Sequence, residues 1–234
     1  MTEQPIDNLL QIQSNKHKIV GAIIQARMTS KRFPGKSMAI LRSKPVIEHV
    51  IRNIKAIQRL DKVILAVPDT PESEPLLELA KQLSIENFCG DENNVLDRYY
   101  QAAKFFKLDI IMRITGDCPF IHPVICDEIL QFALTRKLDY CSNCFPNRTY
   151  PKGFDCEVFT MEALEAAKQM ADPLQPGDFE HVTPWMQRTE GLRRANMIQN
   201  VDASSMNFCV DLPEDIERLE KVVIKDTTDE DKAA

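Results

Sequence analysis

The sequence has no Asp or Glu between Asn8 and Ile47, although the chain of 234 residues is acidic, with 29 Lys and Arg against 35 Asp and Glu. Aromatic residues are also scarce in this window, where Phe33 is the only one. The lack of acids predicts an anion site, with a solvated basic loop as the alternative. The acidic chain and the lack of aromatics exclude a nucleic-acid stripe and favour a small polyanion such as a nucleoside triphosphate. The bases of the window are Lys16, Lys18, Arg27, Lys31, Arg32, Lys36, Arg42 and Lys44.

Long apolar runs are missing as well. No stretch approaches the roughly 18 consecutive apolar residues that a membrane-spanning helix needs, so no membrane partner is expected. Residues 1–15 have neither a basic segment nor an apolar one, which argues against a signal peptide. The seven cysteines are an odd number, and Cys141 and Cys144 form the only C-x2-C pair, without a second pair for a structural zinc. We therefore expect free thiols in the cytoplasm.

Apolar runs alternate with segments of helical periodicity through the first half of the chain, which predicts an α/β fold with a mainly parallel sheet flanked by helices. We expect buried strands at 19–24, 63–67 and 109–114, and helices at 46–57, 76–83, 95–106 and 123–133. The second half predicts helices at 161–170, 179–188 and 213–223, strands at 194–199 and 207–210, and an irregular, strand-like segment at 140–160. The predicted organisation is an N-terminal extension (1–18), one domain (19–224) and a flexible acidic tail (225–234).

Ligands of such sheets bind at the carboxyl ends of the strands, which directs attention to the loop of residues 25–36. This loop carries Arg27, Lys31, Arg32 and Lys36 beside hydroxyl side chains and a Pro-Gly turn. Guanidinium forks, an ammonium group and free backbone N–H groups are what phosphates bind. The chain has only seven glycines, and four of them fall in suspected site loops: Gly35, Gly90, Gly116 and Gly153.

The stretch from Ile24 to Lys36, Ile-Gln-Ala-Arg-x-x-Ser-x-Arg-x-Pro-Gly-Lys, resembles the N-terminal signature of the cytidylyltransferase family, which includes CMP-Kdo and CMP-acylneuraminate synthetases. It is most similar to the branch named for spore-coat polysaccharide biosynthesis protein F. Further segments resemble that family in the same order. They are Gly90–Tyr99, Ile114–Ile121 with its Gly-Asp-x-Pro, Asp155–Val158, His181–Pro184, and Asp211–Asp215 with its Asp-x-Pro-Glu-Asp.

The resemblance implies a nucleotide-diphospho-sugar-transferase-like fold and an enzyme that activates a sugar with CTP, giving CMP-sugar and pyrophosphate for surface polysaccharide biosynthesis. It points to an ulosonic or nonulosonic acid as the sugar. Implied catalytic residues are Arg27, Arg32, Lys36 and Asp117. Implied nucleotide-binding residues are Gln25, Ala26, Arg27, Ser30, Arg32, Gly35, Lys36, Asp97, Arg98 and Gly116. A solvated Asp97–Arg98 pair on a helix face is the alternative for those two residues.

Two aspartates are candidates for binding Mg²⁺. Asp117 follows a predicted buried strand, and Asp211 ends a predicted short strand before a Pro-started helix. A carboxylate facing triphosphate oxygens is repulsive unless a hard cation bridges them, and Mg²⁺ takes one or two carboxylates together with phosphate oxygens and waters. The resemblance implies the same two roles. The alternatives are a turn aspartate for Asp117 and a helix-start acid for Asp211.

Candidate partners of the acceptor sugar lie in the irregular segment at 140–160 and at His181. An acidic sugar needs a cation, which Arg148 or Lys152 would supply; a dimerisation arm of a homodimer, or a plain surface loop, is an equal reading of this segment. His181 is weighed against a structural histidine. The full set of candidate substrate-binding residues is Arg148, Tyr150, Lys152, Asp155, Glu157 and His181.

Two rival functions remain open at the level of sequence. One is another nucleotide-sugar enzyme, including a glycosyltransferase on a similar fold, for which Asp155-Cys156-Glu157 is a loose echo of the D-x-D metal motif. The other is a nucleotide-binding regulator without turnover. The presence of both Asp117 and Asp211 favours an enzyme, because a binder needs no metal geometry.

Overall fold

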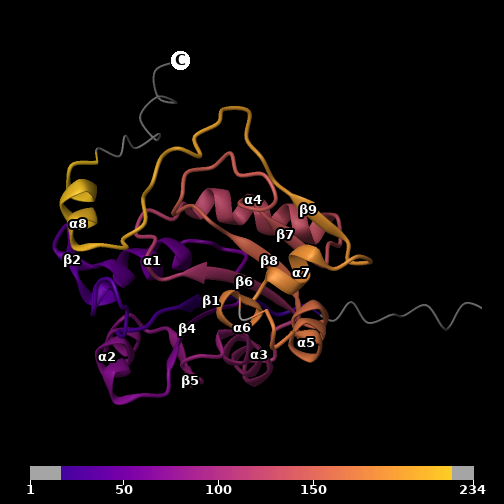
Figure 1. Ribbon diagram of the computed structural model, residues 1–234, viewed down its shortest axis with the longest axis horizontal. Coiled ribbons are helices and arrows are strands. Elements are labelled where there is room, and N and C mark those ends of the chain that lie inside the picture. Colours follow the sequence, from indigo (N-terminus) through magenta and orange to yellow (C-terminus); the bar gives the residue numbers. More distant parts are fainter. Residues whose placement is uncertain (1–16, 176, 223–234) are drawn as a thin grey trace, which may run out of the picture.

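A seven-stranded sheet forms the centre of the computed structural model, which describes residues 17–175 and 177–222 (Figure 1). Its strands lie in the order β5-β4-β1-β6-β8-β7-β9. Their bounds are β1 Val20–Gln25, β4 Lys62–Pro68, β5 Glu86–Gly90, β6 Ile110–Thr115, β7 Tyr140–Ser142, β8 Glu157–Thr160 and β9 Arg194–Asn196. The pairs β4–β5, β1–β4, β1–β6 and β7–β9 are parallel, and β8 runs antiparallel to both of its neighbours.

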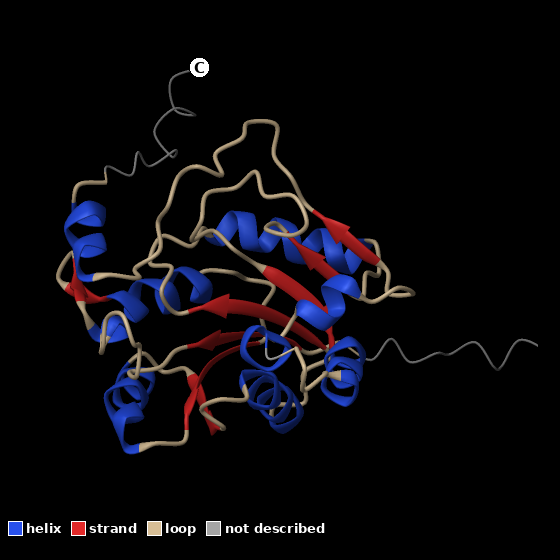
Figure 2. Ribbon diagram, in the orientation of Figure 1, coloured by secondary structure: helices blue, strands red, loops and turns tan. Residues whose placement is uncertain are grey.

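Helices cover both faces of the sheet, as Figure 2 shows. Alternation along β1 explains why. Ala22 and Ile24 pack in one apolar cluster with α1, α2 and α4, whereas Ile23 packs in another with α3, α5 and α7. A strand buried on both faces needs the continuous apolar run that β1 has. The helices are α1 Val46–Lys55, α2 Glu74–Gln82, α3 Val95–Phe105, α4 Pro123–Thr135, α5 Met161–Met170, α6 Gly177–His181, α7 Pro184–Arg188 and α8 Pro213–Glu220.

The predicted α/β class and the mainly parallel sheet are confirmed. The small elements β2 (Ile40–Leu41) and β3 (Lys44–Pro45) form a separate two-stranded sheet, and the 3₁₀ turns η1 (Lys36–Met38) and η2 (Pro71–Ser73) follow strands β1 and β4. No helix within residues 17–175 and 177–222 is long and apolar enough to cross a membrane. All seven cysteines are free thiols.

Two predictions about the elements were wrong, and one strand of the main sheet was missed. The edge strand β5 was missed because its first residues, Glu86 and Asn87, are polar and exposed and show no apolar run. The helix predicted over 179–188 is two short helices, because Val182 has a φ of 70° between them. The strand predicted over 207–210 is a single bridge between Asn207 and Lys152.

The predicted terminal segments fall largely outside the description. Residues 1–16 of the predicted extension and the whole predicted tail (225–234) lie outside the described residues, and α8 is described to its end at Glu220.

Candidate active site

A cleft of 850 Å³ opens where β1 and β6 end. Its wall comes from the loop after β1, the turn before α3, the end of β6, α6 and the segment before α8. Its lining includes eleven of the residues predicted from the sequence: Gln25, Ala26, Arg27, Ser30, Arg32, Lys36, Arg98, Gly116, Asp117, His181 and Asp211. Residues more than 180 positions apart in the sequence thus meet at one edge of the sheet, as the rule for parallel sheets requires.

The loop after β1 folds back on itself at Gly35. This residue has a φ of 73°, which favours glycine, and its N–H donates to the carbonyl of Met28 at 2.8 Å. The hydroxyl of Ser37 donates to the carbonyl of Arg27 at 3.2 Å and closes the turn from the other side. Gly35 does not line the cleft; it shapes the loop, and its nucleotide contact stays a prediction. This turn brings Lys36 to the wall of the cleft.

Lys36 connects the two predicted metal ligands. Its Nζ donates to Asp117 Oδ2 at 2.7 Å and to Asp211 Oδ1 at 3.2 Å, and also to the Val210 carbonyl at 3.1 Å. Two oxygens at these distances from one nitrogen lie no more than about 6 Å apart. Since Mg²⁺ binds oxygens at about 2.1 Å, a shared ion would need these two oxygens within about 4.2 Å of each other. Arg32 Nη2 donates to the same oxygen of Asp211 at 2.9 Å.

Two groups of this cluster, Asp117 and Lys36, have shifted pKa values, and both shifts favour the charged form. Burial alone raises the pKa of Asp117, but the charge and hydrogen bond of Lys36, with hydrogen bonds from Thr115 and Cys118, outweigh it and leave the pKa below its usual value. Burial likewise opposes the charge on Lys36, yet Asp117 and Asp211 raise the pKa of Lys36 above its usual value. Lys36 and Asp117 are therefore both charged in the cleft, and the hydrogen bond between them fixes their relative position.

The Asp117–Lys36 pair predicts a pH dependence of stability. Because the pKa of Asp117 is lower in the folded state, its contribution is present above the pKa of the unfolded chain and is lost as the pH falls through the folded value. We expect Asp117→Asn to lower the free energy of unfolding at pH 7 by about 2 kcal/mol, and this difference to shrink as the pH falls below the usual pKa of an aspartate, about 3.9. Urea unfolding of both proteins between pH 7 and pH 3 measures it; a difference independent of pH contradicts the assignment.

Gly116 lets the end of β6 approach β1. A Cβ atom on this residue would lie 2.7 Å from the Gln25 carbonyl oxygen and 2.7 Å from Ile47 Cδ1, so no side chain fits. Its N–H donates to the carbonyl of Gln25 at 2.8 Å. The close contact places Asp117, one residue further on, at the mouth of the cleft.

The side chains of Arg98 and Asp97, at the start of α3, have different surroundings. Arg98 is 2% exposed and lines the cleft, and its guanidinium donates to the Asp91 carbonyl, while its buried Nε has no partner among the described residues. Asp97 does not line the cleft. Its carboxylate accepts from Lys168 and from Gln101 Nε2, which joins α3 to α5, and its nucleotide contact stays a prediction. Adjacent helix positions face different directions, which explains the split.

Five of the six predicted acceptor residues do not line the cleft, and four of them belong to the segment from Arg148 to Asp155. Arg148 and Asp155 pair with each other, with Arg148 Nη2 at 2.7 Å from Asp155 Oδ2. Tyr150 is buried, and burial, with some help from Glu128, raises the pKa of its hydroxyl. Lys152 is exposed and contributes its backbone to the bridge with Asn207. Arg148 is thus taken up by its ion pair with Asp155, whereas the Lys152 side chain is exposed, and the contact of this segment with an acidic sugar stays a prediction.

Glu157 lies behind the cleft rather than in it. It is 3% exposed on β8, opposite Arg113 of β6, and its Oε2 accepts from Arg113 Nη1 at 2.6 Å. Its Oε1 accepts from the hydroxyls of Tyr140 at 2.5 Å and Thr183 at 2.8 Å. Glu157 was predicted to bind substrate, but it holds a cleft residue in place.

We expect Glu157→Gln to lower the free energy of unfolding by about 3 kcal/mol, because the buried Arg113 loses its ionic partner. Urea unfolding measures this change, with Glu217→Gln on the exposed side of α8 as the matched control. Equal stability of the Glu157→Gln protein and the wild type would show that Arg113 is not held by this ion pair.

Several residues that line the cleft were not among the candidate site residues: Ser37, Glu92, Asn93, Val95, Arg113, Thr115, Phe179 and Glu180. Arg113 carried a usable signal, since it is the one charged residue inside the otherwise apolar run from Ile110 to Ile114. Phe179 and Glu180 carried none, because their place depends on the break at Val182.

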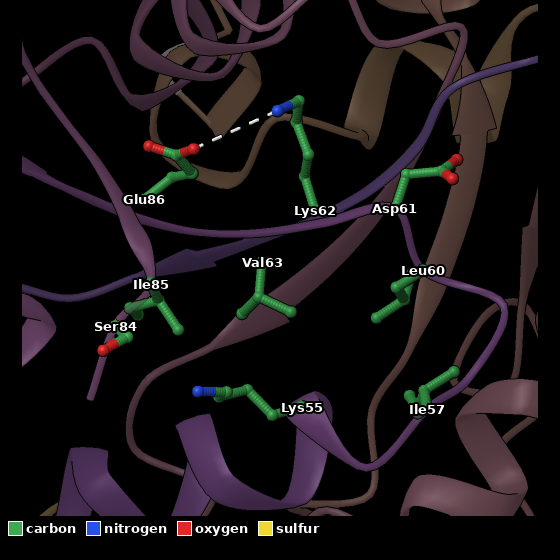
Figure 3. Close-up of a pocket in the computed structure, with 9 residues that line it drawn as sticks. All are labelled: Lys55, Ile57, Leu60, Asp61, Lys62, Val63, Ser84, Ile85 and Glu86. Atoms are coloured by element: carbon green, nitrogen blue, oxygen red, sulfur yellow. Dashed lines mark ion pairs between the residues drawn. The ribbon is translucent and has the colours of Figure 1, made fainter.

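A second hollow of 420 Å³ lies at the opposite edge of the sheet, where β4 and β5 begin (Figure 3). Lys62 and Glu86 lie 4.0 Å apart there, and Lys55 Nζ donates to the Leu83 carbonyl at 2.6 Å. This end of a parallel sheet does not hold ligands in such folds. The chemistry is therefore assigned to the cleft at the carboxyl ends.

The doubly covered, mainly parallel sheet with a basic loop and two aspartates at its carboxyl edge defines a nucleotide-binding α/β protein. The cytidylyltransferase family model matches residues 21–233, and the chain therefore belongs to the cytidylyltransferase family. The family resemblance noted in the sequence is thereby confirmed, and with it that the protein is a nucleotide-transferring enzyme with cytidylyltransferase activity.

Individual relatives agree with the family. An uncharacterised protein of Methanocaldococcus jannaschii is 36% identical over 175 residues, covering 75% of this chain and 69% of that protein. The spore coat polysaccharide biosynthesis protein SpsF of Bacillus subtilis is 28% identical over 214 residues, covering 87% and 85%.

Two solved structures share the fold. A cytidylyltransferase from Leptospira borgpetersenii has a TM-score of 0.82 and 31% identity, covering 87% of this chain and 86% of that one. A CMP:2-keto-3-deoxy-manno-octonic acid synthetase complexed with CTP has a TM-score of 0.68 and 16% identity, covering 87% and 97%. The second is similar in fold alone.

Proposed function

We propose that the enzyme transfers the cytidylyl group of CTP to an acidic sugar, giving a CMP-sugar and pyrophosphate, in the biosynthesis of a surface polysaccharide. The convergence of Arg32, Lys36, Asp117 and Asp211 in one cleft carries the proposal. CTP in a structure of the same fold supports the choice of nucleotide, and the SpsF relative supports the polysaccharide pathway.

The loop after β1 is suited to bind the triphosphate. Arg27, Lys31, Arg32 and Lys36 all line the cleft beside the hydroxyl of Ser30. The Arg32 side chain is 64% exposed and its contact with Asp211 lies at the surface, so it exchanges easily for a phosphate oxygen. Guanidinium groups bind phosphate through paired hydrogen bonds, and such contacts stabilise the charge that moves onto pyrophosphate.

Asp117 and Asp211 fit a magnesium ion. They offer carboxylate oxygens that converge on one point, which the Lys36 ammonium group holds, and Mg²⁺ needs only one or two protein carboxylates when phosphates complete its shell. No group of three or more His, Cys, Asp or Glu within the described ranges forms a larger metal centre. Bound there, the ion would neutralise phosphate charge during transfer. Lys36, released from the carboxylates, would reach a phosphate oxygen instead.

In the proposed transfer, a hydroxyl oxygen of the sugar bonds to the α-phosphorus of CTP while the bond to pyrophosphate breaks, and the hydroxyl proton passes to water. The protein contributes position and charge rather than covalent chemistry. Arg27, Arg32 and Lys36 hold the departing pyrophosphate, and the shape of the cleft sets the approach of the sugar.

A pyrophosphate-release assay tests the proposal. It combines CTP, UTP, GTP or ATP with 3-deoxy-manno-octulosonate, N-acetylneuraminate or neutral sugars, with and without Mg²⁺. We expect release with CTP, Mg²⁺ and an acidic sugar. Release with another nucleotide would overturn the choice of CTP, and tight CTP binding without release for any acceptor would support a non-catalytic regulator.

Arg32→Ala tests the phosphate loop. We expect the Kd for CTP to rise about 10-fold, because one charge-assisted contact to phosphate is lost. Isothermal titration measures it, and Arg59→Ala, which removes an exposed arginine paired with Asp127, is the matched control. Unaltered CTP affinity in Arg32→Ala would mean that the basic loop is a solvated surface.

A further inference from the structure

Arg113 occupies the floor of the cleft on β6. It lines the cleft together with Thr115, two residues further along the same strand and therefore on the same face. Its side chain is only 12% exposed, so its remaining accessible surface belongs to the cleft. Neither the sequence motifs nor the phosphate-binding loop accounts for a guanidinium at this place.

Glu157 holds Arg113 through one nitrogen only. Arg113 Nη1 donates to Glu157 Oε2, while the other oxygen of that carboxylate is used by neutral donors, namely the hydroxyls of Tyr140 and Thr183 and the Gln187 amide. Within the part of the chain that the structure describes, the Nε of Arg113 has no partner, and its Nη2 makes no hydrogen bond. The Nε is buried and cannot reach a ligand, whereas Nη2 is not among the buried unpartnered atoms, so its two N–H donors remain for a ligand.

The charge of Arg113 is secure. Burial opposes it, but the charge of Glu157 outweighs burial and holds the pKa of Arg113 above its usual value. A buried ion pair adds little to stability compared with apolar residues of the same size. The Arg113 guanidinium is charged, is held by Glu157 and keeps N–H donors without a partner at the cleft. Recognition of an anion explains such a group better than a contribution to stability does.

The cleft has two halves. The basic loop follows β1, whereas Arg113 lies on β6 opposite Glu157 of β8, and Thr183, just after α6, donates to that same carboxylate. The phosphates of CTP use the first half under the proposed function. The part of the cleft lined by Arg113 and by Phe179, Glu180 and His181 of α6 remains for the other substrate.

We propose that Arg113 and α6 form the acceptor subsite, and that Arg113 binds a carboxylate of the acceptor sugar. The planar guanidinium fork matches a carboxylate. Glu157 is a positioning residue, because it acts through Arg113. The inference rests on the proposed function, and it moves the acceptor from the segment around Arg148, whose cation is already paired with Asp155.

Direct binding tests the subsite. Calorimetry on the full chain with CMP and Mg²⁺ present compares 3-deoxy-manno-octulosonate and N-acetylneuraminate with the methyl ester of each, and with a neutral-sugar phosphate. We expect at least one acid to bind about 10-fold more tightly than its ester, because the ester loses the charged contact. No preference for an acid over its ester, or tighter binding of the sugar phosphate, overturns the proposal.

Variants assign the preference to Arg113. Arg113→Gln should remove the preference for the acid over its ester, and Arg113→Lys should keep part of that preference. Arg148→Gln should leave the preference unchanged. The double variant Arg113→Gln/Glu157→Gln replaces the ion pair by two amides and keeps the test available if the single variant unfolds. Glu157→Gln should weaken binding of the acid but not of the ester, which a purely structural role would not do.

CTP affinity separates the two proposals. In Arg113→Gln it should stay within about twofold of the wild type, since the triphosphate lies in the other half of the cleft. Loss of acid preference with normal CTP binding supports the subsite. An acid preference that survives in Arg113→Gln overturns the subsite alone, and absence of CTP binding in the wild type overturns the proposed function.

Discussion

Asp117→Asn is expected to reduce pyrophosphate release about 1000-fold while leaving the protein folded. The amide removes the negative charge that would hold a cation against the phosphates, but it keeps the size of the side chain. Lys36 retains Asp211 and the Val210 carbonyl as partners, so the loop after β1 stays attached. Steady-state release at saturating CTP, Mg²⁺ and acceptor measures the loss.

Asp127→Asn is the matched control for Asp117→Asn. Asp127 pairs with Arg59 on the outside of α4 and does not line the cleft. We expect it to retain full activity. Normal turnover by Asp117→Asn would show that this carboxylate neither binds a metal ion nor orders the site.

Lys36→Met is expected to have the next largest effect. The substitution leaves Asp117 and Asp211 facing each other without the cation that joins them, and the lysine itself is only 13% exposed. We expect turnover to fall about 100-fold, because a phosphate contact is lost. We also expect the free energy of unfolding to fall by about 3 kcal/mol without Mg²⁺, the cost of breaking a largely buried pair.

Magnesium should separate the two effects of Lys36→Met. If the carboxylates bind the ion, added Mg²⁺ should restore part of the lost stability, since the ion replaces the missing ammonium group. Turnover should stay low. Lys55→Met, which changes a lysine at the far edge of the sheet, controls for the loss of one positive charge. Stability that does not respond to Mg²⁺ would argue against a shared ion.

The strands of the sheet could be predicted where they are buried on both faces, because such strands have continuous apolar runs in the sequence. The strands β1, β4 and β6 and the helices α1, α3, α4 and α5 follow from such runs and from helical periodicity. β5 was not predictable in this way, because an edge strand is held by its pairing with β4 and keeps polar side chains. The break between α6 and α7 depends on one residue, Val182, in a conformation that a valine rarely adopts.

The candidate site was predictable to a similar degree. The basic loop, Asp117 and Asp211 were recognisable because their motifs are local in sequence, and the sheet brings them together. Arg148 and Asp155 have the right charges for an acceptor site, but their mutual ion pair depends on the path of a loop. Arg113 and Glu157 face each other across β6 and β8, a register that no local motif encodes.

The most direct test of the shared ion is a crystal structure of the protein with CTP and Mn²⁺, in which anomalous scattering locates the metal. We expect one peak within about 2.2 Å of an oxygen of Asp117 and an oxygen of Asp211, with Lys36 turned to the phosphates. CTP bound in the cleft with Lys36 still joining the two aspartates, and no metal between them, would contradict the account.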